Sequence, residues 1–273
     1  MPHYGDKKYW EEHYKKNEGE TFYWLEEYPT LKKTIDSLKI PKNSGKILNV
    51  GCGNSELSEN MYDNGYLNIY NIDISQKVIN LMTERSKNRP GIIYKVMDVC
   101  DIKYENNFFD LIIDKSTMDA LSCGYYYYIN IAKMLKEIQR VLKVGGYYMM
   151  VSYEEPESRM IHLNRKFLKF KIDILKIEQK GEKGKDNYNY IYLCQKLEGA
   201  DEDSEKFFDE IINELIQEEE MEEDDQDECQ EKIKNKENKN INININDDYD
   251  KFIQEIKNSN KIIRFELNND KKD

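Results

Sequence analysis

The chain has 273 residues, of which 39% are hydrophobic, enough for one large domain but not for two generous cores. Its net charge of −12 is unevenly placed, because residues 201–273 hold 25 acidic and 11 basic residues and leave +2 on residues 1–200. A near-neutral domain has no basic field for gripping a nucleic-acid backbone, which argues against nucleic acid as the main substrate. We expect one α/β domain over residues 1–198 and an acidic, Asn-rich, low-complexity tail over residues 199–273.

The five cysteines predict neither a disulfide framework nor a metal site, because their number is odd and no CxxC pair occurs. The first ten residues lack the apolar region of a signal peptide, and no stretch approaches eighteen apolar residues. We therefore expect a cytoplasmic protein that does not span a membrane.

Aromatic residues gather ahead of the first predicted strand. Within a helix expected over residues 6–16, one face carries Tyr9, Trp10, His13 and Tyr14. A second set follows at residues 22–24, and another helix is expected over residues 29–39. The simplest interpretation of the first set is packing against the core. The alternative is that both sets form a lid over a ligand that carries an adenine ring and a cation.

The stretch KILNVGCGNS, residues 46–55, organises the rest of the chain. Its apolar residues predict a buried strand that stops at Gly51 and Gly53, where the backbone can turn tightly and approach a ligand. A helix is expected to follow, with Asn54 or Ser55 as its N-cap. The positive end of that helix then faces the glycine turn, which predicts a nucleotide-sized binding site.

The next strand, expected over residues 68–73, ends in Asp73, twenty residues after Gly53. A carboxylate at this place can bind both ribose hydroxyls. A diphosphate-binding turn needs a third glycine, and none follows Gly53 at the required spacing, which disfavours a nicotinamide dehydrogenase. The pattern fits an adenosine without a 5′-phosphate, and therefore predicts S-adenosylmethionine as cofactor.

Further elements alternate between helix and strand, which predicts parallel strands joined by right-handed crossovers. A helix over residues 75–87 is expected to begin at the N-cap Ser75, and a strand over residues 92–99 carries Asp98 near its end. Asp98 is placed to bind an exocyclic amine such as that of adenine. The alternative for a lone aspartate at a strand end is a turn or a helix cap.

A fourth strand over residues 109–113 leads into Asp114, Lys115 and Asp119. In a doubly wound sheet the end of this strand faces the reactive end of a cofactor, so Asp114 and Asp119 are candidate catalytic residues. Either carboxylate could hold an acceptor amine or receive its proton. The alternative is that they cap the segment that follows.

The remaining pattern predicts a helix over residues 129–143, a strand over 147–153, an irregular or helical link over 154–163, and a hairpin of strands over 166–178 and 188–196. The predicted fold is a Rossmann-like, doubly wound, mostly parallel seven-stranded sheet with a C-terminal antiparallel hairpin and helices on both faces. Residues 204–217 have apolar residues at helical spacing and predict a helix that docks on the domain or on a partner. Charge as dense as that of residues 218–228 usually stays solvated.

Several segments resemble the class I S-adenosylmethionine-dependent methyltransferases, and more narrowly the elongation factor 1-alpha lysine methyltransferase group, including the methyltransferase-like protein 13 type. These segments are YWEEHY, ILNVGCGNSELS, MDV and DKSTMDAL. The resemblance covers about residues 6–196. It implies direct in-line methylation of a protein lysine, with elongation factor 1-alpha as the expected protein partner. It also implies cofactor contacts at Trp10, Tyr14, Trp24, Gly51, Asp73, Ile74, Asp98, Val99 and Lys115, to which the glycine turn adds Gly53.

One position departs from the resemblance, because Asn49 stands where many members of the superfamily carry an acid. Two other functions stay open on the residues alone. The chain could methylate a small molecule with the same cofactor site, or it could be a catalytically silent binding module of methyltransferase-like fold.

Overall fold

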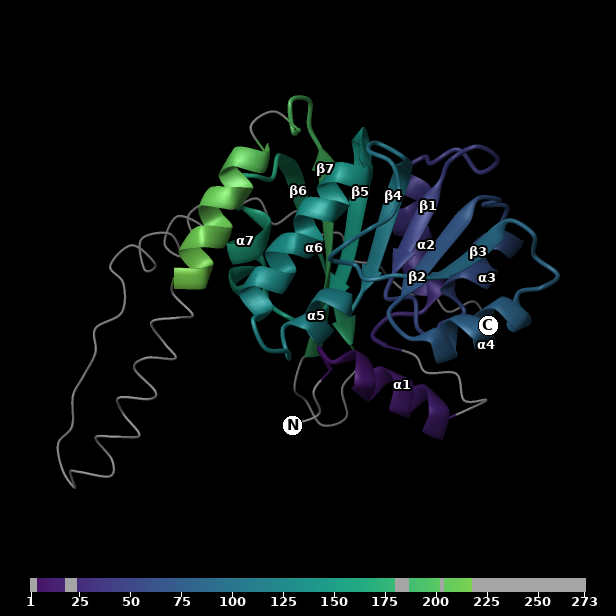
Figure 1. The fold of residues 1–273 in the computed structure, drawn as a ribbon. Coiled ribbons are helices and arrows are strands. Elements are labelled where there is room, and N and C mark those ends of the chain that lie inside the picture. The colour runs from purple at the N-terminus through teal and green to yellow at the C-terminus, as the bar shows by residue number, and fades with distance from the viewer. Residues whose placement is uncertain (1–3, 18–23, 180–186, 202–203, 218–273) are drawn as a thin grey trace, which may run out of the picture.

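The computed structural model describes residues 4–17, 24–179, 187–201 and 204–217. Its strands are β1 (Ile47–Val50), β2 (Ile69–Asp73), β3 (Ile92–Val96), β4 (Phe109–Lys115), β5 (Leu142–Ser152), β6 (Phe170–Gln179) and β7 (Asn187–Lys196). They form one sheet in the order β3-β2-β1-β4-β5-β7-β6 (Figure 1). The strands β1 to β5 pair in parallel, whereas β7 runs antiparallel to both β5 and β6. The predicted doubly wound sheet with a terminal hairpin is confirmed.

Helices cover both faces of this sheet. They are α1 (Lys7–Lys16), α2 (Tyr28–Ser37), α3 (Leu57–Asp63), α4 (Gln76–Arg85), α5 (Thr117–Leu121), α6 (Tyr127–Val141) and α7 (Pro156–Leu163). One core contains Leu31 of α2 and Met61 of α3, and the other contains Leu135 and Ile138 of α6. Because both faces are covered, β1 is buried along its whole length, which explains its nearly continuous apolar sequence.

Several predicted boundaries are wrong, among them the start of β6, which lies at Phe170 and not at residue 166. Helix α3 begins at Leu57 with Glu56 as its N-cap, and the hydroxyl of Ser55 only accepts a hydrogen bond of 3.3 Å from the Leu57 N–H. Strand β3 ends at Val96, so Asp98 lies beyond the strand.

Strand β5 begins at Leu142, five residues earlier than predicted, and the preceding helix accordingly ends at Val141 and not at residue 143. Leu142 pairs with Phe109 before an irregularity in β4 shifts the register, and regular pairing resumes between Leu111 and Tyr147. A bulge of this kind adds residues to one strand without breaking the sheet, which hid the true start of β5 in the sequence.

Residues 204–217 form a helix that packs beside α6 and α7 (Figure 1). Its Phe208 and Leu215 are buried in the same core as α6. Lys136 of α6 forms an ion pair with Glu205. The amphipathic face of this segment therefore covers the domain, and residues 218–273 lie outside the described residues.

Candidate active site

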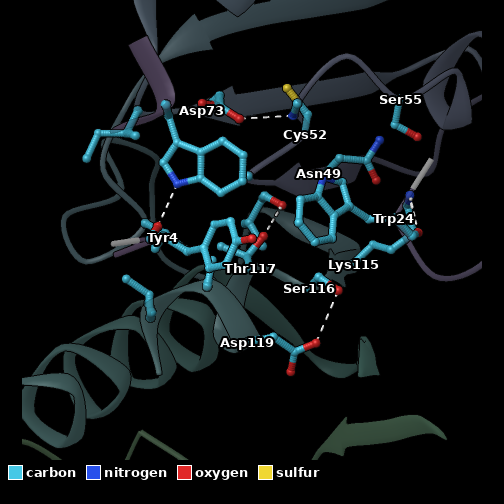
Figure 2. A pocket seen from close by; sticks show the side chains of 18 of the residues that line it. Tyr4, Trp24, Asn49, Cys52, Ser55, Asp73, Lys115, Ser116, Thr117 and Asp119 are labelled. Atoms are coloured by element: carbon cyan, nitrogen blue, oxygen red, sulfur yellow. Dashed lines mark hydrogen bonds between the residues drawn. The ribbon is translucent and has the colours of Figure 1, made fainter. Parts of the chain in front are cut away.

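A pocket lies at the carboxyl ends of the parallel strands, where β1, β2, β4 and β5 deliver Gly51, Asp73, Lys115 and Tyr153 to one cavity. In Figure 2, Asp73 lies at one end of the pocket and Asp119 at the opposite end. Every residue that the sequence assigned to cofactor binding lines this pocket: Trp10, Tyr14, Trp24, Gly51, Gly53, Asp73, Ile74, Asp98, Val99 and Lys115. The structure brings these residues together, and their binding to a cofactor stays a prediction.

The glycine turn exposes backbone to the pocket. Gly51 has φ +54° and Gly53 has φ +52°, values that residues with side chains rarely adopt. A Cβ atom on Gly51 would lie 2.2 Å from the hydroxyl oxygen of Thr117, and one on Gly53 would lie 2.8 Å from the hydroxyl oxygen of Tyr14. Both positions therefore require glycine, for conformation and for space.

Asp73 is the buried carboxylate at one end of the pocket, with 7% of its surface exposed. Its Oδ2 accepts a hydrogen bond of 2.9 Å from the Gly53 N–H, and its Oδ1 accepts one of 2.9 Å from the Ser75 N–H. Burial raises the pKa of Asp73 to about 6. A carboxylate has about four acceptor positions, so each oxygen can still accept one hydroxyl from a ligand.

Asn49 presents an unpaired acceptor beside the turn. Its Nδ2 donates to the Ser58 hydroxyl at 2.6 Å and to Asn71 Oδ1 at 3.1 Å, which fixes the orientation of the amide. Its Oδ1 is buried and has no hydrogen-bond partner among the described residues. A buried acceptor that lines a pocket without a partner calls for a donor from the ligand. The sequence had shown Asn49 only as a departure from an expected acid.

Aromatic side chains roof the pocket. Trp10 stacks on Tyr14 with 5.8 Å between ring centroids and meets Trp24 edge-on at 6.1 Å. Its indole N–H donates to the backbone carbonyl of Tyr4 at 2.6 Å (Figure 2). These contacts agree with the lid interpretation of the first aromatic set, while Phe22 and Tyr23 of the second set lie outside the described residues.

Two contacts with the backbone of other segments hold the aromatic roof in place. The carboxylate of Glu11 accepts hydrogen bonds of 2.7 Å and 3.3 Å from the N–H groups of Gln76 and Lys77, which fastens α1 to the N-terminus of α4. On the other side, Gly5 crosses the loop after α5 so closely that a Cβ on Gly5 would lie 2.6 Å from the Cα of Gly124.

Lys115 ties the roof to the sheet. Its Nζ donates to the backbone carbonyl of Trp24 at 2.8 Å (Figure 2). Burial lowers the pKa of Lys115 to about 8, although the charges of Glu26 and Glu27 act in the opposite direction. The ammonium of Lys115 is thus hydrogen-bonded to a backbone carbonyl of the roof.

Asp114 does not line the pocket. Its carboxylate is fully buried and accepts hydrogen bonds from the Thr117 N–H at 2.7 Å, the Met118 N–H at 3.3 Å and the Tyr148 hydroxyl at 2.8 Å. Burial raises its pKa to about 6. This geometry favours the capping alternative for Asp114, because the carboxylate has no surface on the cavity, and its predicted catalytic role stays a prediction.

Asp119 lines the pocket, and three side-chain hydrogen bonds hold its carboxylate. Its Oδ1 accepts hydrogen bonds of 2.6 Å from both Arg159 Nη2 and the Ser152 hydroxyl, and its Oδ2 accepts one of 3.1 Å from the Ser116 hydroxyl. The side chains of Asp119 and Arg159 are each only 4% exposed. Protonating this carboxylate would leave a buried guanidinium unpaired, so the geometry favours a positioning role over that of a proton acceptor.

Further residues line the pocket that the sequence analysis did not select, among them Tyr4, Met97, Cys123 and Tyr153. Only Tyr153 carried a usable signal, because it directly ends a predicted strand. Within the described part of the chain, no group of His, Cys, Asp or Glu residues could hold a metal ion, and no helix has the length and apolar content of a membrane span.

Comparison with solved structures finds, among others, an S-adenosylmethionine-dependent methyltransferase from Methanosarcina mazei, with a TM-score of 0.46 and 19% identity, covering 63% of this chain and 99% of that one. The MccD protein has a TM-score of 0.49 and 14% identity, covering 61% of this chain and 96% of that one.

Sequence comparison is more specific. Residues 48–150 match a family described as a methyltransferase domain. The eEF1A lysine and N-terminal methyltransferase of Mus musculus is 38% identical over 152 residues, which are 55% of this chain and 22% of that protein. Its Drosophila melanogaster homologue is 37% identical over 147 residues, 53% of this chain and 22% of that protein. The chain thus spans about a fifth of the length of these relatives. Residues 48–150 of the chain thus match a methyltransferase domain, and the chain is similar to part of the eEF1A lysine and N-terminal methyltransferases.

Proposed function

We propose that this protein transfers a methyl group from S-adenosylmethionine to a lysine side chain of a protein, with eEF1A as the best candidate substrate. The observation that carries the proposal is that the glycine turn, Asp73 and Asn49 line one cavity. The relatives whose names include eEF1A lysine methylation support the choice of acceptor.

The pocket residues fit the parts of this cofactor. Asp73 offers two acceptor positions to the ribose hydroxyls, and Asp98 can accept from the adenine amine while its Oδ1 holds the Cys100 N–H at 2.8 Å. Asn49 Oδ1 can accept from the ammonium of the methionine part. Exposed backbone at Gly51 allows that part to approach without meeting a side chain.

S-adenosylmethionine, when bound, would supply an electrophilic methyl group on a sulfonium. A neutral amine would bond to the methyl carbon in line with the carbon–sulfur bond, which would break with its electrons staying on sulfur. The protein's task is to align the amine and to exclude water. The aromatic roof of Trp10, Tyr14 and Trp24 provides an apolar cover that favours a neutral amine over a charged one. Asp119, held by Arg159, fixes the ends of β4 and β5 on the acceptor side.

The test is to incubate the full chain with S-adenosylmethionine and purified eEF1A and to locate methylated lysines by peptide mass spectrometry. We expect the unchanged protein to methylate eEF1A, and we expect the Asp73→Ala variant to do so much more weakly. If the protein binds the cofactor but leaves eEF1A unmodified, eEF1A is not the substrate.

Two measurements then test the alternative functions. Tritium transfer from labelled cofactor into a lysate distinguishes another protein acceptor from a small molecule. A protein that binds no cofactor would support the silent-module alternative.

A further inference from the structure

Tyr153 stands at the acceptor end of the pocket without a role in cofactor binding. It directly follows β5, lines the cavity and keeps 49% of its surface exposed. The residue before it, Ser152, donates a hydrogen bond of 2.6 Å to Asp119, and both Tyr153 and Asp119 line the cavity. Asp119 lies at the end of the pocket opposite Asp73 (Figure 2). An adenosine held by Asp73 therefore leaves the Tyr153 end open for the acceptor.

The backbone around Tyr153 is fixed on both sides. The hydroxyl of Ser152 accepts a hydrogen bond of 3.1 Å from the Glu154 N–H, and the Glu154 carbonyl accepts one of 2.8 Å from the Tyr192 hydroxyl. Ser152 is fully buried. An exposed ring on a fixed backbone loses little conformational entropy when a ligand packs against it.

The buried ion pair described above supports the same segment. Ser152 donates to Asp119 at 2.6 Å and accepts from Arg159 Nε at 3.1 Å. Asp119 and Arg159 therefore act on the acceptor side through the residue that precedes Tyr153. The ion pair of Asp119 and Arg159 can thus position the segment that carries Tyr153, a role that does not require Asp119 to accept a proton.

We propose that Tyr153 binds the acceptor, packing its ring against the amine-bearing side chain and aligning it with the methyl group. This proposal rests on the proposed methyltransferase function. An aromatic face attracts an arriving ammonium and still packs against the neutral amine that reacts. The exposed half of the residue leaves a path by which the departing proton reaches water. Partial burial and the nearby acids raise the pKa of the Tyr153 hydroxyl, so it stays protonated and does not act as a base.

Steady-state kinetics of the full chain with eEF1A as acceptor test the role of the ring. Tyr153→Leu should raise the KM for the acceptor about tenfold, whereas Tyr153→Phe, which keeps the ring, should stay within about twofold of the unchanged protein. The affinity for S-adenosylmethionine, measured by calorimetry, should be the same in all three. Tyr125→Leu is the matched control, because Tyr125 is 79% exposed and does not line the pocket. An acceptor KM for Tyr153→Leu that equals that of the control overturns the proposal.

A second measurement covers the case in which eEF1A is not the substrate and the unchanged protein leaves it unmethylated. Sinefungin carries an amine-bearing carbon in place of the methylated sulfur and so places a cation where the acceptor meets the methyl group. Tyr153→Leu should weaken sinefungin binding severalfold and leave S-adenosylhomocysteine binding unchanged. Equal effects on both ligands would overturn the role of Tyr153, independently of which protein is methylated.

Discussion

The affinity for S-adenosylmethionine should fall as the pH drops through 6, because Asp73 must be ionised to accept both ribose hydroxyls. Burial raises the pKa of this carboxyl to about 6, and the charge of Glu11 adds to the shift. A group with this pKa is about nine-tenths ionised at pH 7 and about one-tenth ionised at pH 5. The dissociation constant should therefore be about tenfold larger at pH 5 than at pH 7, a loss of about 1.4 kcal/mol.

Calorimetric titrations between pH 5 and pH 7 measure this dependence. Asp73→Asn should bind more weakly at every pH and lose the slope. His13→Gln is the control for a titrating group in the roof, because burial lowers the pKa of His13 below its usual value. An affinity of the unchanged protein that stays flat over this range, or a slope that persists in Asp73→Asn, would refute the reasoning.

The same raised pKa acts on folding with the opposite sign. A carboxyl whose pKa is higher in the folded protein contributes stability that is complete below the unfolded value of 3.8 and is lost as the pH rises through about 6. The buried Asp114, with a pKa also raised to about 6, acts in the same direction. Between pH 7 and pH 5 the ligand-free protein should therefore become more stable while its cofactor binding weakens, a divergence that thermal melts with and without cofactor can detect.

Two substitutions test the packing around the site. Arg159→Met should lower the free energy of unfolding in urea by about 3–5 kcal/mol, because it leaves a buried carboxylate unpaired, and adding Asp119→Asn should recover much of the loss; a double variant as unstable as the single one would contradict this. Gly53→Ala should weaken cofactor binding, because its Cβ would lie 2.8 Å from the Tyr14 hydroxyl oxygen. Tyr14→Phe should partly restore binding in that background, and calorimetry that shows no effect of Gly53→Ala would exclude the clash.

The sequence was most informative where a short stretch determines both structure and chemistry. Gly51, Gly53 and Asp73 could be placed at one site because parallel strands end at the same edge of a sheet. Ser75 was identified as an N-cap from its position before an amphipathic run, and its hydroxyl accepts from the Val78 N–H at 3.4 Å. These features depend on local spacing, which a single chain displays directly.

The features that the sequence did not predict depend on partners far along the chain. Arg159 lies 40 residues from Asp119, and nothing in either local pattern indicates their ion pair. The amide of Asn49 is oriented by Ser58 and by Asn71, which come from two other elements. Such contacts follow from how elements pack, so periodicity and motif spacing carry no signal for them.

The crossing of Gly5 over Gly124 has a consequence for the N-terminal segment. Here the backbone of the roof lies so close to the wall of the cavity that neither can move closer. The spacing of these two glycines thereby sets the height of the roof at this side of the cavity. The pair also restricts substitution, because any larger residue at one position forces the other to give way.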